Sequence, residues 1–320
     1  MLKTNKIRLM EQSQELSFDK AFEEFLTFCK TKNLSEATLR NYRLQFKTLS
    51  TFVDTSSPVS VIDQSFIQSY ILNLQGRMHN PETINTALRT FRVLVNYWSS
   101  LKYCQSVKFK LLKTEIKIKE VYTDAELQLL LRKPDIKKSS FTEYRTWVVI
   151  NFLIATGCRL RTLINVRIKD IDFDNEVVSL QVTKNRRAQL LPLPQSMLTI
   201  LKEYIKIRSN AFETKPEDVL FCSETGTQLY DTTVNHNINK YNRNRGVNKT
   251  GVHLFRHTFS KNFIMSGGDC FRLQRQLGHS TLEMSKRYAN IWDKDLQQNF
   301  EKFNLLERLK APQQKIKMAK

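Results

Sequence analysis

The pattern of apolar and polar positions predicts helices over most of the first third of the chain. From Phe18 to Tyr103, apolar residues recur at helical spacing in four successive runs. Polar residues and a proline fit the starts of these runs. Ser35 suits an N-cap, Asp63 stands near the start of the third run, and Pro81 falls in the first turn of the fourth. Four helices with short connections predict a compact bundle.

The middle of the chain combines helical and strand patterns. Thr123 and Glu126 fit a capping box at a helix start. A long apolar helix is predicted from Tyr144 to Thr156, and Gly157 ends it. Short runs typical of strands follow, separated by polar turns, at 171–173, 177–182 and 189–193. Helices then return, so we predict a mainly α protein with a small β-sheet.

A basic stretch divides the two predicted domains. From Lys102 to Lys119 the chain has six lysines and a single acid, Glu115, with little periodicity. We interpret it as an interdomain linker that lies along a phosphate backbone, with a plain solvated tether as the alternative. The predicted divisions are a flexible N-terminus (1–16), a helical domain (17–103), the linker (104–120), a second domain (121–309) and a basic tail (310–320).

Composition narrows the class of partner. The formal charge of +20 and the isoelectric point near 9.8 favour nucleic acid or an anionic surface, with simple solubility as the alternative. No apolar run reaches the length of a membrane span, and the N-terminus lacks a secretion signal. The five scattered cysteines form neither a disulfide framework nor a CxxC metal site. We therefore expect a cytoplasmic protein with no membrane partner.

The last part of the chain carries residues suited to attack on a phosphodiester. His253 and Arg256 lie three residues apart, and His279 is followed nine residues later by Tyr288. An arginine binds phosphate oxygens, a histidine moves protons, and a phenol can be the nucleophile. The pentavalent transition state gains negative charge, so a second guanidinium should assist. Arg159, which follows the predicted end of the apolar helix, is our candidate.

The leaving 5′ oxygen needs a proton, and a lysine on a turn between two strands can supply it. Lys184 occupies such a turn. For a single loop lysine, and for a single arginine such as Arg159, a surface position is the ordinary alternative. The order and spacing of the whole set therefore matter more than any one member.

These residues make the chain resemble the tyrosine recombinases of the phage integrase family, and the resemblance extends from about Phe18 to Leu309. The resemblance is carried by five motifs in the family's order, which are Thr156-Gly157-Cys158-Arg159-Leu160, Lys184 in its β-turn, His253-Leu254-Phe255-Arg256, Leu277-Gly278-His279-Ser280 and Tyr288. It implies a SAM-like, helical core-DNA-binding domain followed by an α+β catalytic domain. It also implies cleavage without ATP, a metal or another cofactor.

The resemblance implies a role for each matched residue. Tyr288 attacks the phosphate and forms a 3′-phosphotyrosyl link, while Arg159 and Arg256 neutralise the phosphate oxygens. Lys184 protonates the leaving oxygen. His253 assists the tyrosine's proton, and His279 donates a hydrogen bond to a non-bridging oxygen.

One position departs from the family pattern. Many members carry an acid three residues after the first arginine, where this chain has Thr162. That acid is usually regarded as a supporting contact. Its absence puts the surroundings of Arg159 in doubt, but not Arg159 itself.

The implied partners are double-stranded DNA and further copies of the chain. Four protomers would exchange strands through a Holliday junction, with a DNA-bending protein or an excisionase as an optional accessory. The apolar segment after Tyr288, up to Leu309, is expected to dock on a neighbouring protomer, with packing in its own protomer as the alternative. Candidate DNA contacts, each with a solvated surface position as the alternative, are Arg40, Arg43, Arg89, Arg92, Lys108, Lys110, Arg161 and Arg187.

Several other functions remain open from the sequence. The favoured role is integration, excision or transposition of a mobile element, and the alternatives are a Xer-like dimer resolvase or a non-catalytic DNA-binding derivative. A type IB topoisomerase shares the chemistry, whereas a metal-dependent nuclease needs an acidic cluster that the sequence lacks. His253 and His257 could be a metal pair, but no nearby ligand completes a site. Other tyrosines that composition would allow as nucleophile, and that we interpret as packing residues, are Tyr204, Tyr230 and Tyr241.

Overall fold

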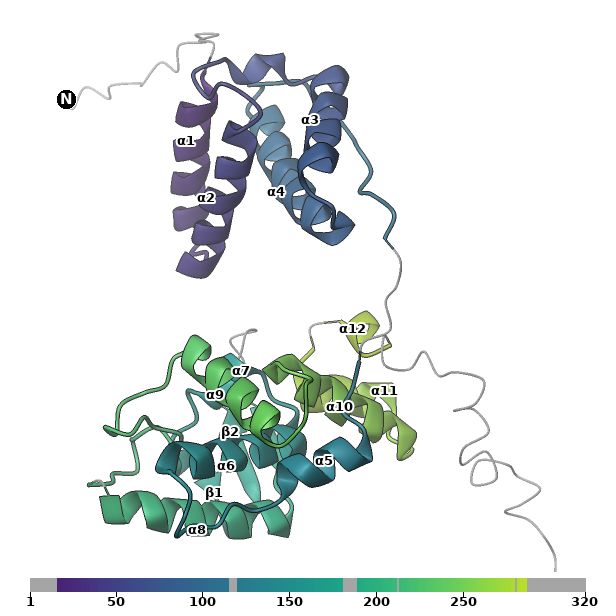
Figure 1. The fold of residues 1–320 in the computed structure, drawn as a ribbon. Helices are drawn as coiled ribbons and strands as arrows, with labels where there is room; N and C mark the ends of the chain where they lie inside the picture. Colours follow the sequence, from purple (N-terminus) through teal and green to yellow (C-terminus); the bar gives the residue numbers. More distant parts are fainter. Residues whose placement is uncertain (1–15, 115–119, 181–188, 212, 280, 287–320) are drawn as a thin grey trace, which may run out of the picture. The chain divides into compact units, whose positions relative to one another are not determined.

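The chain folds as two compact units, Met1–Lys117 and Ile118–Lys320 (Figure 1). The structure is a computed structural model, and it describes residues 16–114, 120–180, 189–211, 213–279 and 281–286. Unit 1 and unit 2 each have their own hydrophobic core. The predicted fold class, mainly helical with a small sheet, is confirmed.

Unit 1 is a bundle whose helix boundaries follow local capping signals. The hydroxyl of Ser35 accepts a hydrogen bond from the Thr38 amide, and the Asp63 carboxylate accepts one from the Phe66 amide at 2.7 Å. Pro81 occupies the first turn of its helix, as predicted. The elements of unit 1 are α1 (Phe18–Thr31), α2 (Glu36–Ser50), a 3₁₀ turn (Val59–Val61), α3 (Gln64–Arg77) and α4 (Pro81–Ser100).

Helix α4 is central to unit 1, because α1, α2 and α3 all pack against it. Trp98 of α4 is fully buried and donates its indole N–H to the Ala21 carbonyl of α1 at 3.0 Å. Phe22 of α1 stacks on Phe46 of α2 with ring centroids 3.9 Å apart. Large aromatic side chains therefore supply much of the buried apolar area that holds this small domain together.

After α4 the chain runs back along the bundle in an extended segment, residues 104–114, which we call the strap. The Asn85 side chain of α4 donates to the Leu112 carbonyl at 2.9 Å and accepts from the Leu112 amide at 2.8 Å. Arg92 of α4 donates to the Phe109 carbonyl at 2.6 Å and lies over the Phe109 ring at 5.0 Å. The strap is thus fixed to α4 at two points.

The strap has a regularity that the sequence pattern did not predict. Val107, Phe109 and Leu111 pack against the core of unit 1, whereas Lys108 and Lys110 between them are exposed. Successive side chains of an extended chain point to opposite sides, so one side of the strap is apolar and the other is basic. Residues 107–112 of the segment that we predicted to be a linker are therefore docked on unit 1, although they form no regular secondary structure.

Unit 2 is built around α6 (Phe141–Thr156), which is buried on almost every side. The capping box predicted for Thr123 and Glu126 is present at the start of the helix that precedes it. None of the helices in the described ranges is long and apolar enough to cross a membrane. The other helices of unit 2 are α5 (Asp124–Leu131), α7 (Leu160–Leu163), a 3₁₀ turn (Ile168–Asp170), α8 (Gln195–Ala211), α9 (Asp231–Asn244), α10 (Val252–Met265), α11 (Cys270–Leu277) and α12 (Leu282–Lys286).

The small sheet of unit 2 is antiparallel, with strand order β1-β2-β3. Val178 lies opposite Ile171 on one side and Leu191 on the other. The three predicted strands are confirmed, with bounds β1 (Ile171–Asp172), β2 (Val177–Leu180) and β3 (Gln189–Pro192). The connection from β2 to β3, residues 181–188 with Lys184, lies outside the described residues.

Candidate active site

The end of α6 determines where Arg159 stands. Gly157 caps α6 in the left-handed conformation, with φ of 62°. A Cβ at this position would lie 2.5 Å from the Phe259 ring and 2.9 Å from the Leu277 side chain. Glycine is therefore needed for both its backbone conformation and its lack of a side chain. The sharp turn places Arg159 at the N-cap of α7.

Arg256 lies on α10 and is buried, with 5% of its surface exposed. Its Nη1 donates to the Gly157 carbonyl at 2.7 Å, and its Nη2 donates to the Leu277 carbonyl at 2.9 Å. A buried guanidinium is costly unless its donors are satisfied, and these carbonyls satisfy two of them. Arg256 thereby joins the ends of α6 and α11.

Thr162 stands where many relatives have an acid, and its side chain is buried. The support that we describe for Arg256 comes from backbone carbonyls.

The two arginines meet at one acceptor. Nη1 of Arg159 lies 3.4 Å from the carbonyl oxygens of both Leu277 and Gly278. The Leu277 carbonyl also binds Arg256, so the two guanidiniums lie side by side. Like charges held this close repel each other, and an anion bound between them would relieve the repulsion. The sequence prediction that these distant arginines converge agrees with this geometry.

His279 is placed by the end of α11. Gly278 ends that helix in the left-handed conformation, with φ of 60°. The chain turns there, and His279 is buried, with 8% of its surface exposed. The His279 amide donates to the Gln274 carbonyl at 3.0 Å. The ring nitrogen Nδ1 lies 2.8 Å from the hydroxyl of Ser285 on α12. His279 therefore directly follows Leu277 and Gly278, whose carbonyl oxygens both face Arg159.

His253 completes the described part of the site. It lies on α10, three residues before Arg256, and is exposed. Residues three apart in a helix share a face, so His253 stands one turn away from the buried arginine. Four predicted catalytic residues are thus described, namely Arg159, His253, Arg256 and His279. Lys184 and Tyr288 lie outside the described residues.

A contact that the sequence did not predict ties the sheet to α11. The side-chain amide of Gln189, the first residue of β3, donates to the Arg275 carbonyl and, at 2.9 Å, to the Gln276 carbonyl. These carbonyls belong to the last turn of α11, where few backbone donors are available; the Arg275 carbonyl also accepts from the Gly278 amide at 3.2 Å. The strand that follows the predicted lysine turn is thereby attached beside Gly278 and His279. A glutamine at a strand start gives no sequence signal for such a contact.

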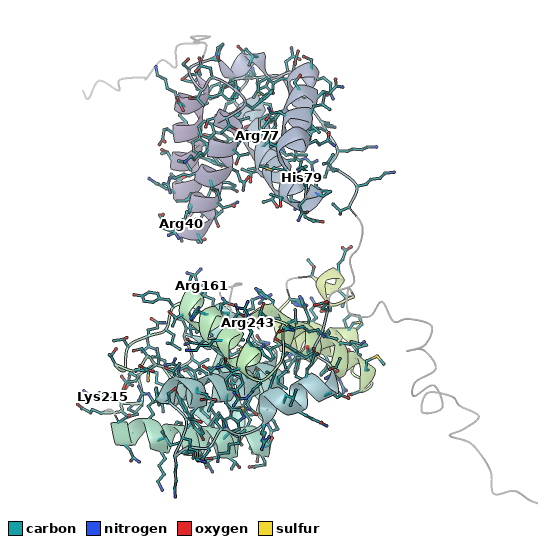
Figure 2. All side chains as sticks on the ribbon, viewed as in Figure 1. Arg40, Arg77, His79, Arg161, Lys215 and Arg243 are labelled. Carbon is teal, nitrogen blue, oxygen red and sulfur yellow. The ribbon has the colours of Figure 1, made fainter. Side chains whose placement is uncertain are left out.

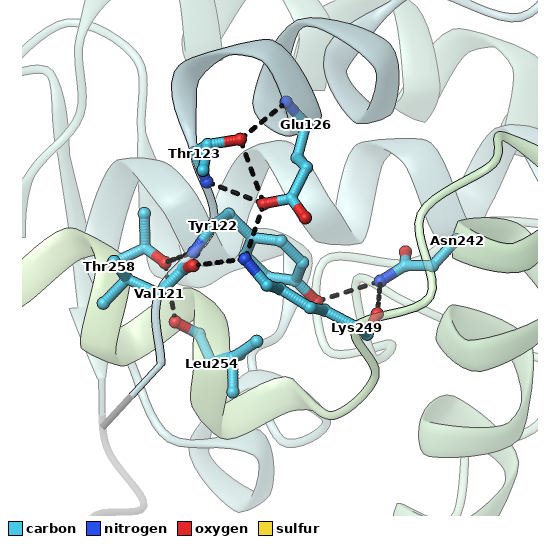
Figure 3. Close-up of polar contacts among 8 residues, drawn as sticks. All are labelled: Val121, Tyr122, Thr123, Glu126, Asn242, Lys249, Leu254 and Thr258. Carbon is cyan, nitrogen blue, oxygen red and sulfur yellow. Dashed lines mark hydrogen bonds and ion pairs between the residues drawn. The ribbon is translucent and has the colours of Figure 1, made fainter. Parts of the chain in front are cut away.

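The first residues of unit 2 are hydrogen-bonded to α10 and to Lys249, which precedes that helix (Figure 3). The Tyr122 amide donates to the Thr258 hydroxyl at 3.0 Å, two residues beyond Arg256. Lys249 donates to the Val121 carbonyl at 3.0 Å and to the Glu126 carboxylate at 2.9 Å. The hydrogen bond from the Thr123 amide, followed by that from Lys249, lowers the pKa of Glu126. This network fixes the point where the chain enters unit 2 against the helix that carries the site.

Burial makes the Cys158 thiol and two of the other tyrosines poorly suited as nucleophiles. Burial raises the pKa of the Cys158 thiol to about 11, while the Thr156 hydroxyl and the charge of Arg256 act in the opposite direction. Burial also raises the pKa values of Tyr204 and Tyr241, and Tyr241 donates its hydroxyl to the Leu130 carbonyl. These tyrosines are packing residues, as predicted. Tyr230 is not, because 77% of its side chain is exposed.

The candidate DNA contacts differ in their surroundings. Arg40 and Arg43 are exposed on α2, and Figure 2 shows Arg40 on unit 1. Arg89 is exposed and pairs with Glu82 at 3.7 Å. On unit 2, Arg161 is exposed on α7, whereas Arg187 lies outside the described residues. Among the residues that the structure describes, no three potential metal ligands lie together.

Family models match both units of the chain. A model described as "Phage integrase family" matches residues 120–294, and one described as "Phage integrase SAM-like domain" matches residues 17–117. Tyrosine recombinase XerD of Staphylococcus haemolyticus is 27% identical over 290 residues, which cover 88% of this chain and 97% of that protein.

Two solved structures show the same fold. The Tn1549 transposon integrase in complex with transposon right end DNA matches with a TM-score of 0.73 at 19% identity, over 90% of this chain and 99% of that one. A lambda integrase tetramer bound to a Holliday junction matches with a TM-score of 0.68 at 13% identity, over 88% of this chain and 80% of that one.

Proposed function

We propose, from the premise that this chain belongs to the phage integrase family, that it is a site-specific recombinase which cuts and rejoins DNA through a 3′-phosphotyrosyl intermediate. The observation that carries the proposal is the convergence of Arg159 and Arg256 on the Leu277 carbonyl, with His279 two residues further on. Two adjacent guanidiniums match the non-bridging oxygens of one phosphate. A binding protein that only neutralised the DNA backbone would not need this arrangement.

In the proposed reaction, the phenolic oxygen of Tyr288 attacks the phosphorus, and the bond from phosphorus to the 5′ oxygen breaks. Lys184 gives its proton to the leaving 5′ oxygen, while His253 takes up the proton of Tyr288. A phenol has a pKa near 10, so the nearby cations must favour its deprotonation. A 5′ hydroxyl from a second strand reverses these steps, because the phosphotyrosyl link conserves the bond energy. No ATP and no metal take part.

During this exchange the arginines act electrostatically. Arg256 is held rigidly by two carbonyls, so it needs little rearrangement when charge develops on the phosphate. Preorganised donors of this kind are typically worth a factor of about 10²–10³ in rate each. Arg159, with longer contacts of 3.4 Å, can turn from the Gly278 carbonyl towards the phosphate.

DNA binding in this proposal uses both units. Arg40, Arg43 and Arg89 contribute phosphate contacts from unit 1, and Arg161 and Arg187 contribute them from unit 2. Lys108 and Lys110 extend the contact along the basic side of the strap. For Arg92 we favour a structural role over the DNA contact that the sequence suggested, because its guanidinium is engaged by Phe109.

The proposed assembly on DNA is a tetramer of this chain that passes through a Holliday junction. The segment after Tyr288, which the structure does not describe, would dock on a neighbouring protomer by helix-in-groove packing. A DNA-bending protein or an excisionase is an optional accessory. The lambda integrase of the same fold assembles as a tetramer on a Holliday junction, which supports this part of the proposal.

The biological role that we propose is integration and excision, or transposition, of a mobile element. The similarity to XerD over 97% of that protein's length favours a second candidate, resolution of chromosome or plasmid dimers. The two candidates differ in their DNA. A dimer resolvase recombines two like sites on one circle, whereas an integrase joins element ends to a separate target. Recombination assays with both arrangements would distinguish them.

The chemical proposal is tested by trapping the covalent intermediate. Duplexes with a randomised segment are first selected for binding to the protein, then resynthesised with a nick near the bound centre, so that cleavage releases a short fragment and cannot reverse. Incubation in EDTA followed by denaturation in SDS should yield a protein–DNA adduct. The adduct should be absent with Tyr288→Phe and present with Tyr230→Phe, a matched change at an exposed tyrosine.

Each alternative has its own outcome in this assay. Adducts that persist in Tyr288→Phe would contradict the assignment of the nucleophile. A metal requirement would favour a nuclease, and relaxation of supercoiled plasmid without site preference would favour a topoisomerase. Binding without any adduct from the wild-type protein on its selected duplex would favour a non-catalytic derivative and would overturn the proposal.

A further inference from the structure

The imidazole of His279 is held by the side chain of Ser285 on α12. The two side chains are buried, with 8% of His279 and none of Ser285 exposed. The distance from Nδ1 of His279 to Oγ of Ser285 is 2.8 Å, which is within the usual range of a hydrogen bond. A buried hydroxyl and a buried ring nitrogen both need partners, and here they supply each other.

The backbone of His279 is fixed separately. Its amide donates to the Gln274 carbonyl at 3.0 Å, and its own carbonyl accepts from the Gln274 side chain at 3.3 Å. With the backbone held at one end and Nδ1 held at the other, the plane of the ring is determined. The other ring nitrogen, Nε2, lies across the imidazole from Nδ1. The contact with Ser285 therefore decides which nitrogen is presented to a phosphate.

We infer that Ser285 is a positioning residue for strand cleavage, which sets the tautomer and the orientation of His279. The inference rests on the proposed function above. The Ser285 hydroxyl donates a hydrogen bond to Nδ1, so that the neutral imidazole carries its own proton on Nε2. Only that tautomer donates a hydrogen bond from Nε2 to a non-bridging phosphate oxygen, which is an acceptor.

The same contact connects two motifs of the chain. Ser285 lies on α12, which packs against α11, and it precedes Tyr288 by three residues along the sequence. The hydrogen bond therefore joins the residue that binds the phosphate to the short helix that leads to the nucleophile. A displacement of α12 would break the contact to Nδ1. In metal sites, removal of a partner that fixes a histidine tautomer typically changes affinity or activity by about 10–100-fold, and we take the same magnitude as the expectation here.

The kinetic test uses a double-mutant cycle. We expect Ser285→Ala to slow single-turnover cleavage of the nicked, selected duplex by about 10–100-fold, and Ser285→Thr, which keeps the hydroxyl, to restore most of the rate. In the background of His279→Ala, the same Ser285→Ala change should have little further effect, because the group that it orients is gone. Thermal unfolding of every variant shows whether the protein remains folded.

A second measurement reads the tautomer without relying on activity. Nitrogen-15 spectra record the side chains of all five histidines, and the signals lost in His279→Ala belong to His279. In the wild-type protein these signals should show Nδ1 of His279 as an acceptor and Nε2 as protonated. Ser285→Ala should shift this signature, and Ser285→Thr should retain it. If the wild-type protein forms no DNA adduct, the proposed function fails while this spectroscopic arm still tests Ser285.

Three results would overturn the inference. The first is an unchanged cleavage rate in Ser285→Ala. The second is an equal loss of rate with and without His279, which would indicate that Ser285 acts only through the stability of α12. The third is an imidazole of His279 that is protonated on Nδ1 in the neutral wild-type protein.

Discussion

At the scale of single residues, the site depends on backbone carbonyls as much as on side chains. Arg256 is oriented by the Gly157 and Leu277 carbonyls, and the second of these is shared with Arg159. Sequence motifs identified both arginines, because their types and order are distinctive. The carbonyl contacts, and the hydrogen bonds of Gln189 and Ser285, were not predictable. Their contacts form only when the ends of α6, α11 and β3 meet in three dimensions.

Gly157 offers the sharpest stability test at this scale. A Cβ at Gly157 meets the Phe259 ring at 2.5 Å, whereas one at Gly246, which also has a positive φ, meets nothing within 4 Å. Alanine in the left-handed conformation costs about 1–2 kcal/mol at either position. At Gly157, overpacking should add about 1–3 kcal/mol to that loss.

The measurement is the free energy of unfolding in urea of Gly157→Ala and Gly246→Ala. Gly157→Ala should also reduce cleavage, since the Gly157 carbonyl orients Arg256. Equal destabilisation by the two variants would contradict the packing described around Gly157.

At the scale of elements, helices were predicted well and the strap was not. Helix periodicity and caps such as Ser35 and Asp63 are local signals, so the sequence was sufficient for the four helices of unit 1. The strap is held by Asn85 and Arg92 of α4, residues whose partners lie 17 or 27 positions away along the chain. Its alternation of apolar and basic residues is short and was obscured by the neighbouring lysines.

The strap gives a prediction about DNA binding. Lys108 and Lys110 are exposed. They are two positions apart, which corresponds to about 6.6 Å along an extended chain. Replacement of both by alanine should weaken DNA binding on every sequence, because phosphate contacts carry no sequence information. The slope of log affinity against log salt should become shallower by about 2, one for each lost contact.

A matched control removes two positive charges elsewhere. Lys202 and Lys206 are exposed on α8, which Figure 1 places at the opposite edge of unit 2 from α12. Their replacement by alanine should leave the slope almost unchanged. Similar changes in both double variants would show that only net charge matters, and would contradict a specific contact by the strap.

At the scale of the whole molecule, the two units carry different parts of the proposed function. Unit 1 is a helical bundle with the strap docked on it, and the described residues of the proposed catalytic set all belong to unit 2. The fold class and the order of motifs could be predicted from the sequence because helices, caps and the family motifs are each encoded locally. The DNA site could not, since base contacts depend on side-chain positions across a whole interface.

The most direct test of the central claim is to identify the residue that carries the DNA. The covalent adduct, formed on the nicked duplex in EDTA, is digested with trypsin and nuclease and then sequenced by tandem mass spectrometry. We predict that the residual nucleotide is joined by its 3′ phosphate to Tyr288. A nucleotide on any other residue, or one joined through its 5′ phosphate, would contradict the account.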